Sequence, residues 1–250
     1  GYFVSGAGST TDRFLDPPAI ENFHNDGSAF KAFAKLDYAP DDRNLFRLNL
    51  FINRTQFDVP NLPRQESAGQ DQRRTAADNM QSLSWEHIFS PNLVSYLAGY
   101  QRYNSAKLRS NEEATPVYAE QSRHHSNYGV LGSLTWQKGR HTIKTGFEYT
   151  RFPVTESFTF SITDLEDLLE KEPSLPPQGQ ALLFLVAFFF NKQRTGYEGS
   201  IYVQDHINAT RNLTFDLGIR FDGYHFLVVS DYISPRLAVA YHIRKTKTVL

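Results

Sequence analysis

Apolar and polar residues alternate along most of the chain. In Leu213–Gly223 every second residue is apolar from Leu213 to Phe221, and the residues between them are small or polar. Successive side chains of a strand point to opposite faces of a sheet, so this pattern predicts a strand with one apolar and one hydrated face. The same alternation recurs in residues 30–38, 46–53, 94–101, 143–149 and 233–243. The predicted fold class is therefore all-β and antiparallel.

Between these runs, short turn signals alternate with long polar connections. The predicted short turns are Ala39–Arg43, Ser90–Asn92, Lys138–Arg140, Thr210–Asn212 and Arg244–Thr246. The predicted long connections are Phe57–Arg73, Lys107–Gln121, Phe152–Thr195 and Tyr224–Tyr232. A soluble sandwich has no reason to keep its short turns at one end. A barrel in an outer membrane does, with short periplasmic turns and longer external loops.

Strand length and charge favour the same interpretation. We expect strands of about 9–14 residues, longer than the usual 5–6 and close to the roughly 9–11 that cross a bilayer when tilted. In a soluble fold with a closed core, the charged side chains of the hydrated face would be buried at a high cost in free energy. In a wide barrel the same side chains would face a water-filled lumen. The lumen-facing candidates are Arg47, Asn49, Lys144, Glu148, Asp216, Arg220 and Arg236. An open sheet with its polar face in solvent would also satisfy the pattern, although about ten long strands tend to curl or split.

Aromatic residues make up 14% of the chain, and Trp and Tyr lie mostly towards the predicted strand ends. This placement favours the belts that amphipathic rings form at membrane interfaces. General aromatic enrichment in sheets is the alternative.

One segment departs from the alternation. Thr163 and Glu166 have capping-box spacing, and Leu165, Leu168 and Leu169 follow at helical spacing before Pro173. We expect a short helix inside the longest loop. It would serve either as a gating or ligand-contacting element, or simply pack against the loop and the barrel rim.

Composition excludes several classes of function. The 26 Lys and Arg balance 27 Asp and Glu, which argues against a nucleic-acid partner, and the absence of Cys excludes thiol chemistry. The longest apolar run, Ala181–Phe190, is too short for a membrane-spanning helix of about 20 residues. No His pair, Gly-rich loop or nucleophile elbow has the required spacing. We expect no enzyme, no metal and no cofactor.

The two ends of the sequence resemble cut edges. The chain opens on Gly1 without an initiator Met or a signal segment, and it closes at Leu250 within a predicted strand. We therefore expect a segment of a longer protein, with about ten to eleven strands of one barrel domain over residues 1–250.

Specific motifs in 196–243 resemble the barrel of TonB-dependent outer-membrane receptors. They are Tyr202-Val203-Gln204-Asp205, Asn212–Asp222 and Ser234–Tyr241, and the earlier runs Ser90–Leu93 and Gly139–Gly146 look like preceding hairpins of such a barrel. The similarity is greatest to large receptors with an N-terminal carboxypeptidase-regulatory-like domain. The motif residues with an architectural role in that family are Tyr202, Gln204, Asp205, Arg220, Asp222, Pro235 and Arg236.

The resemblance implies a barrel of about 22 strands, filled by an N-terminal plug, in the bacterial outer membrane. It implies uptake of a scarce nutrient, with outer-membrane lipid around the barrel and TonB acting through a plug and TonB box that this sequence does not include. The ligand is not identified. A channel or adhesin-type barrel of another family remains an alternative, and a soluble β-sheet binding module is a further one.

Overall fold

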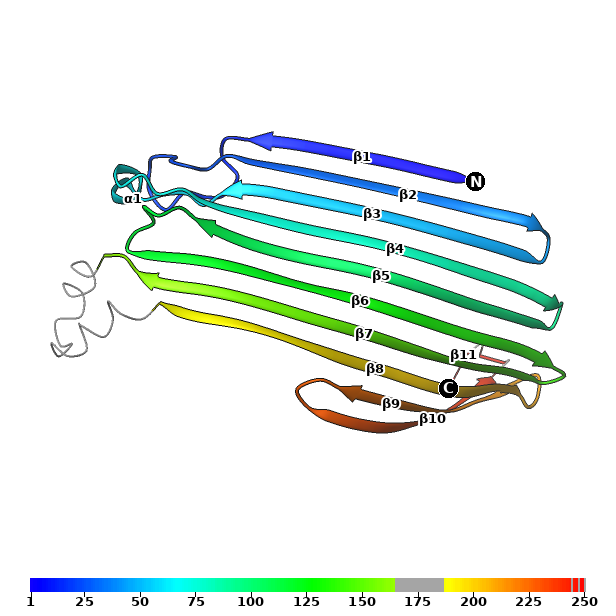
Figure 1. The fold of residues 1–250 in the computed structure, drawn as a ribbon. Coiled ribbons are helices and arrows are strands. Elements are labelled where there is room, and N and C mark those ends of the chain that lie inside the picture. The colour runs from blue at the N-terminus through cyan, green and yellow to red at the C-terminus, as the bar shows by residue number, and fades with distance from the viewer. Residues whose placement is uncertain (165–186, 244, 247, 250) are drawn as a thin grey trace.

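The computed structural model describes residues 1–164, 187–243, 245–246 and 248–249. The chain forms one sheet in which each strand pairs antiparallel with the next along the chain, β1 to β11 (Figure 1). The strands are β1 Tyr2–Thr11, β2 Gly27–Asp41, β3 Asn44–Asp58, β4 Gln72–Ser90, β5 Leu93–Ser110, β6 Val117–Lys138, β7 His141–Ile162, β8 Phe188–Asn208, β9 Leu213–His225, β10 Val229–Ile243 and the short β11 Thr248–Val249. The sheet is not closed, because β1 and β11 do not pair with each other. The predicted all-β, antiparallel, incomplete barrel fold is confirmed.

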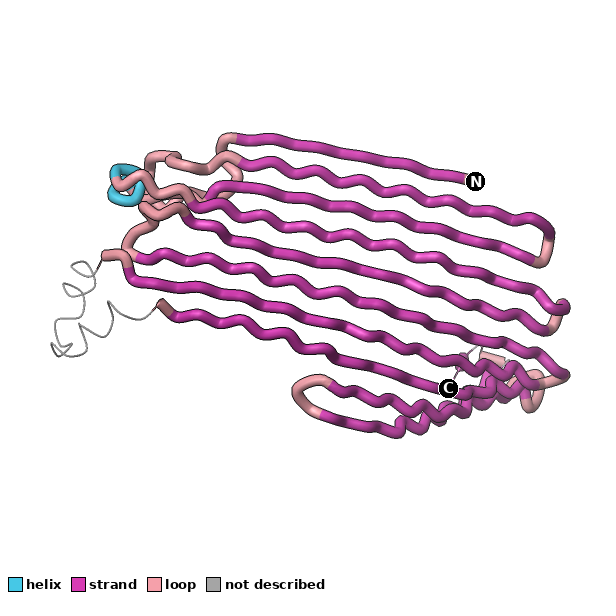
Figure 2. The backbone as a smooth tube through the Cα atoms, viewed as in Figure 1, coloured by secondary structure: helices cyan, strands magenta, loops and turns pink. Residues whose placement is uncertain are grey.

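The predicted short turns at 39–43, 90–92, 138–140 and 210–212 are confirmed and lie together at one end of the sheet, the turn end (Figures 1 and 2). The predicted turn Arg244–Thr246 includes residue 244, which lies outside the described residues. Only Asp42 and Arg43 separate β2 from β3, and Gly139 and Arg140 separate β6 from β7. Gly139 has a φ of 60°, which tight hairpin turns require and Gly adopts without strain. The Asp41 carboxylate accepts the Arg43 N–H at 2.8 Å, so Asp41 stabilises this turn.

The long connections lie at the opposite end, the loop end, but three of them are shorter than predicted. The β5–β6 loop is 111–116 rather than 107–121, and the β9–β10 loop is 226–228 rather than 224–232. For the predicted connection 152–195, β7 runs to Ile162 and β8 begins at Phe188, and residues 165–186 between them lie outside the described part of the chain. The predicted loop at 57–73 is nearly correct, since β3 ends at Asp58 and β4 begins at Gln72. Residues 12–26 form a further connection that the turn signals did not predict.

The strands are also longer than the predicted 9–14 residues, and β4 to β8 run from 18 to 22. In β7 the predicted strand was too short because the apolar side chains move from one face of the strand to the other. Up to Tyr149 the apolar side chains occupy odd positions, whereas Phe152, Val154, Phe158 and Phe160 occupy even ones. Pairing with β8 continues through the exchange without a register shift. A pattern of uninterrupted alternation therefore ends near Tyr149, although the backbone ladder does not.

One short helix, α1 Pro63–Ser67, interrupts the β3–β4 connection among the described residues. Pro63 stands in its first turn, where a missing N–H costs nothing. The helix expected from Thr163 and Glu166 falls largely on residues 165–186, outside the described part of the chain. None of the helices that the structure describes is long and apolar enough to cross a membrane.

Strand register defines two faces, because directly paired residues point to the same side. Phe221, Leu217 and their odd-numbered neighbours in β9 share the apolar face with Ile201 of β8 and Leu237 of β10. The opposite side is the polar face. A single layer encloses no core between layers, and among described residues the buried apolar side chains are those of Pro60, Ala98 and Ala114.

One strand is oriented against its sequence pattern. The sequence groups Val94, Tyr96, Ala98 and Tyr100 of β5 as the apolar set, but register places them on the polar face. Tyr100 explains why this is tolerated, because its ring covers Gly129 of β6 and its hydroxyl lies 3.0 Å from Thr150 Oγ1 of β7. A ring on a glycine shields the backbone there and adds little bulk to the face.

Candidate functional site

The polar face is the candidate functional site, and it carries all the charged positions that the sequence selected for a lumen. Arg47 and Asn49 lie on it in β3, and Lys144 and Glu148 lie on it in β7. Asp216 and Arg220 of β9 and Arg236 of β10 share it. The structure brings the residues from β7, β9 and β10 together, whereas Arg47 and Asn49 lie several strands away.

The residues from β7 to β10 surround a shallow hollow of about 190 Å³. Register places Lys144, Gln204 and Arg236 in one row, with Gly218 between Gln204 and Arg236. Gly218 keeps the row low, because a Cβ there would lie 3.2 Å from Gln204 Cβ. The hollow's polar lining is Lys144, Tyr202, Gln204, Arg220 and Arg236.

Positive charge prevails in this hollow. Arg220 donates to Asp222 at 2.7 Å, but no ion pair within the described residues involves Lys144 or Arg236. Two cations without a carboxylate partner, beside the amide of Gln204, favour a bound or passing anionic group.

The family motif residues divide between the two faces. Tyr202, Gln204, Arg220, Asp222 and Arg236 lie on the polar face, whereas Asp205 and Pro235 lie on the apolar face. The Tyr202 ring covers Gly146, where a Cβ would come within 2.7 Å of the Tyr202 hydroxyl oxygen. Asp205 Oδ2 lies 2.6 Å from Nδ1 of His141, near the turn end. These contacts fit the architectural role that the resemblance implies.

Sequence reasoning missed a second set of ion pairs on the polar face. Asp37 of β2 accepts from Lys35 and from Arg47, each at 3.0 Å, and Arg102 of β5 donates to Asp78 of β4 at 2.7 Å. Arg47 stands directly opposite Asp37 across β2 and β3. The charged residues are visible in the sequence, but only the strand register shows which of them stand opposite each other. Partly exposed pairs like these each contribute only about 0–1 kcal/mol.

Aromatic side chains gather at the loop end of the polar face. Phe152 stacks on Tyr224 with ring centroids 6.0 Å apart, and it lies 5.5 Å from Phe226. Phe158 lies 6.1 Å from Phe188 of the next strand. The signal in the sequence was the exchange of apolar positions after Tyr149 in β7.

Three loops are tied together at the loop end by buried amides. Asn61 is fully buried, donates to Glu66 at 3.0 Å and exchanges hydrogen bonds with Gln70. The Thr115 N–H donates to Gln70 Oε1 at 2.9 Å, and Glu66 also lies 2.8 Å from His24. The connections 12–26, 59–71 and 111–116 therefore form one unit. The hydrogen bond from Asn61, followed by that from His24, lowers the pKa of Glu66 below its usual value.

No three His, Cys, Asp or Glu side chains gather as metal ligands would in the part of the chain that the structure describes. The arrangement of the polar face offers charge, hydrogen bonds and aromatic surface, which are means of binding and passage.

The fold and one family agree on the class of protein. Residues 110–232 match the family described as outer membrane beta barrel domain. The sheet is thus an incomplete antiparallel β-barrel of the bacterial outer membrane. No curated protein matches the chain in sequence.

Solved structures narrow the resemblance to one kind of barrel. The chain is similar to the outer membrane transporter YddB from Escherichia coli, with a TM-score of 0.66 and 15% identity over 99% of this chain and 34% of that one. For the ferric citrate transporter FecA the TM-score is 0.64 at 18% identity, over 97% of this chain and 37% of that one. For FpvA of P. aeruginosa, solved with pyoverdines, it is 0.68 at 10% identity, over 97% and 36%.

These matches confirm the resemblance to the barrels of TonB-dependent receptors at the level of fold. The chain spans little more than a third of the length of each structure. The proteins in them are transporters and receptors rather than enzymes.

Proposed function

We propose that the chain is part of the barrel of a TonB-dependent receptor that takes up a scarce small nutrient across the outer membrane. The observation that carries the proposal is the pair of continuous faces in one long, curved meander. One face is apolar along β9 and its neighbours, and the other is charged from β2 to β10. Residues 1–250 would then all belong to one barrel domain.

In this proposal the apolar face meets outer-membrane lipid and the polar face lines the lumen. An uncompensated charge on the lipid side is costly near the midplane, by about 2–4 kcal/mol for Arg or Lys, whereas a lumen keeps charges hydrated. The seven lumen-facing candidates share the polar face, which supports this orientation.

The ligand would enter from the loop end. The aromatic cluster of Phe152, Tyr224 and Phe226 lies there, and the cationic hollow of Lys144 and Arg236 lies farther along the same face. This sequence of an aromatic mouth and a positive interior suits an anionic or aromatic nutrient. TonB would act through the plug of the whole receptor rather than through the barrel wall.

The full-length parent protein in its host provides the test. A deletion strain should grow more slowly than the parent strain when one nutrient, supplied as ferric citrate, a copper salt or oligopeptides, is limiting. A tonB deletion should slow growth equally, and the two deletions together should add nothing. Growth that depends on the protein but not on TonB would instead support a channel, and a full-length product that is soluble without detergent would support the binding module.

A variant links the function to this chain. Lys144→Gln/Arg236→Gln removes two cations from the hollow, and we expect at least a tenfold loss of uptake for the nutrient identified above. Lys138→Gln, beside the β6–β7 turn, removes a cation away from the hollow and should leave uptake unchanged. Equal uptake by both variants would remove the hollow from the transport path.

A further inference from the structure

Strand β8 is longer than the strand that follows it, so its first part lacks a neighbour on one side. β8 pairs with β7 from Phe188 to Ile207, whereas its pairing with β9 covers only Tyr197–Asn208. Figure 1 shows β8 reaching past the β9–β10 hairpin at the loop end. Within the described part of the chain, residues 188–196 therefore have no neighbouring strand on the side of β9, and we call them the free edge of β8.

The backbone of the free edge presents hydrogen-bonding groups at every second residue. The Asn208 N–H donates to the carbonyl oxygen of Arg140, on the β7 side, at 2.8 Å. The groups of successive residues point to opposite sides of a strand, and no register shift interrupts the pairing of β8 with β7. The odd-numbered residues of β8 therefore turn their N–H and C=O groups away from β7. In the free edge these residues are Phe189, Asn191, Gln193 and Thr195.

The free edge lies beyond the membrane-facing part of the sheet. On the apolar face Tyr149 stacks on Tyr197 with ring centroids 6.4 Å apart, and such rings are typical of the membrane interface. The free edge begins one residue farther towards the loop end. Its next side chains on that face, Thr195, Gln193 and Asn191, are all polar. An exposed edge in water is a template for an added strand.

Side chains on the polar face determine which strand can be added. Lys192 and Arg194 point to this face, because they stand opposite Glu156 and Val154 of β7. Phe188 follows on the same face, with its ring centroid 6.1 Å from that of Phe158. The free edge thus offers two cations and then an aromatic surface.

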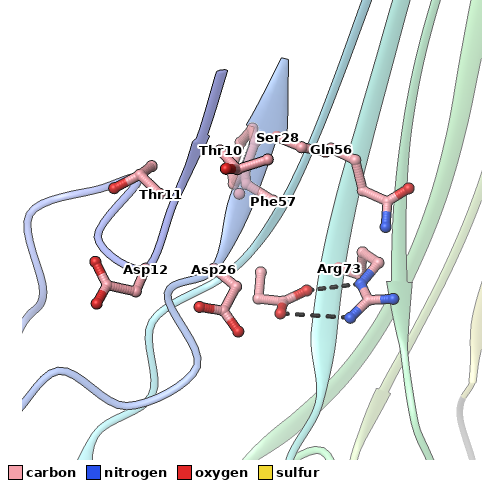
Figure 3. Close-up of a pocket in the computed structure, with 10 residues that line it drawn as sticks. Thr10, Thr11, Asp12, Asp26, Ser28, Gln56, Phe57 and Arg73 are labelled. Carbon is pink, nitrogen blue, oxygen red and sulfur yellow. Dashed lines mark hydrogen bonds and ion pairs between the residues drawn. The ribbon is translucent and has the colours of Figure 1, made fainter. Parts of the chain in front are cut away.

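The two cations of the free edge lack the carboxylate partners that other cations of the loop end have. Arg73 donates to Asp58 at 2.6 Å (Figure 3), and Arg123 donates to Glu156. No ion pair within the described residues involves Lys192 or Arg194, and both residues are exposed. Directly opposed charges in neighbouring strands interact, so the two cations favour carboxylates on an added strand. They disfavour the same edge of a second copy, which would bring like charges together.

We propose that the free edge of β8 binds an extended acidic peptide by strand addition. The backbone of the peptide would exchange hydrogen bonds with the odd-numbered residues of the edge. Its carboxylates would lie beside Lys192 and Arg194, and an apolar side chain would lie beside Phe188. The inference goes beyond the proposed function, because it requires only that the loop end lies in water and depends neither on TonB nor on a nutrient.

The test uses the full-length parent protein in detergent and a fluorescent octapeptide with blocked ends. The peptide alternates Thr with Glu in its first half and Thr with Leu in its second half. Antiparallel pairing then places the two Glu beside Arg194 and Lys192 and a Leu beside Phe188. Fluorescence polarisation measures the dissociation constant. A second peptide, with Gln in place of both Glu, removes only the charge.

Two backbone-methylated forms of the octapeptide test the hydrogen bonds. In the antiparallel pair each Thr stands opposite an odd-numbered residue such as Gln193, so the Thr N–H groups face β8. Methylation of the Thr nitrogens should therefore weaken binding about tenfold or more, because these donors are lost. Methylation of the Glu and Leu nitrogens, which face away from β8, should leave the affinity unchanged.

A charge variant tests the selection of an acidic strand. Lys192→Gln/Arg194→Gln should bind the acidic octapeptide about tenfold more weakly than the wild type, and it should bind the Gln peptide equally well. The matched control is Arg54→Gln/Lys107→Gln, which removes two cations from β3 and β5 that also lack an ion pair in the described residues. The control should bind both peptides like the wild type.

Three results would overturn the inference. Equal affinity for the two methylated peptides, or no measurable binding of the octapeptide, would exclude strand addition. Equal binding of the acidic octapeptide by the wild type and by Lys192→Gln/Arg194→Gln would exclude selection by these cations. A dimer of the parent protein that the octapeptide dissociates would assign the edge to a second copy. None of these measurements involves uptake, so the proposed function is tested separately.

Discussion

At the scale of single residues, glycines under aromatic rings give the sheet its close-packed points. Tyr100 covers Gly129, Phe147 covers Gly132 and Tyr202 covers Gly146. Each ring comes from the residue directly paired with its glycine on the neighbouring strand. Each ring thus occupies the space that the glycine leaves free, and replacing the glycine forces the ring or the neighbouring backbone to move.

Gly146→Ala should destabilise the barrel by about 1–3 kcal/mol, the usual cost of overpacking. The new Cβ would lie 2.6 Å from the Gly132 carbonyl oxygen, which belongs to the backbone and cannot move aside cheaply. Gly99→Ala is the matched control, since its nearest atom is 3.9 Å away and its effect should be close to zero. Urea unfolding of the parent protein from liposomes measures both, and equal stability of the two variants would contradict the packing.

Leu217→Arg should destabilise the parent protein clearly more than Asp216→Arg. Leu217 lies on the apolar face, where Arg near the midplane costs about 2–4 kcal/mol. Asp216 lies on the polar face 2.7 Å from His206, and a pair this exposed contributes about 0–1 kcal/mol. Unfolding from liposomes gives the ranking. If Asp216→Arg were the more damaging change, the apolar face would be packed on protein rather than lipid.

At the scale of elements, the sequence predicted hairpins better than it predicted where strands end. The turns at Asp42, Pro91 and Gly139 were found because Gly, Pro and Asp have strong local preferences. The strand end at Ile162 was missed because the apolar side chains of β7 exchange faces after Tyr149. The strand end at Ser110 was missed because the last residues of β5 are mostly polar or charged. Alternation in the sequence predicts a strand, but a polar segment without alternation belongs to the sheet only because it pairs with a neighbouring strand.

The candidate site shows the same division. The positions of Lys144, Arg220 and Arg236 on one face followed from alternation alone. The hollow that they share depends on which residues stand opposite each other across three strands. This register cannot be predicted from the sequence of a single strand. The aromatic cluster around Phe152 was missed because its residues were assigned to a loop.

The loop unit should respond to pH through Glu66. Its folded-state pKa is depressed, so its contribution is present above the unfolded value near 4.3 and is lost as the pH falls through the lower folded value. At pH 6, Glu66→Gln should speed hydrogen exchange in 59–71, and the difference between variant and wild type should shrink as the pH is lowered from 6 to 3. Glu112→Gln, an exposed carboxylate in the 111–116 loop, is the control. A difference that persists unchanged at pH 3 would assign the effect to shape rather than charge.

Orientation of the hairpins can be tested with epitope tags in the parent protein. Leu227 in the β9–β10 loop is 79% exposed at the loop end, and Gly139 marks the turn end. We expect a tag at Leu227 to be labelled on intact cells and one at Gly139 only after the outer membrane is opened, as external loops and periplasmic turns require. The opposite labelling would reverse the topology.

At the scale of the whole molecule, the sheet is long, curved and open. β1 pairs only with β2, and β11 covers only His242 and Ile243 of β10. The remaining backbone groups along these two edges have no strand to pair with in the described residues. In lipid an unpaired edge is costly, because no water is present to satisfy its N–H and C=O groups.

The 250-residue chain, refolded by itself into detergent micelles or liposomes, should therefore not form a stable monomer. Each exposed edge offers a template for another copy, so we expect aggregates or partly folded β-structure that proteases digest. Circular dichroism, size exclusion and limited proteolysis measure this. Co-refolding with the rest of the parent barrel, supplied as a separate chain, should restore protease resistance because both edges then find partners. A monodisperse, protease-resistant monomer from the 250 residues alone would show that β1 and β10 can close on each other, and the barrel would then be a small one with too narrow a lumen for a plug.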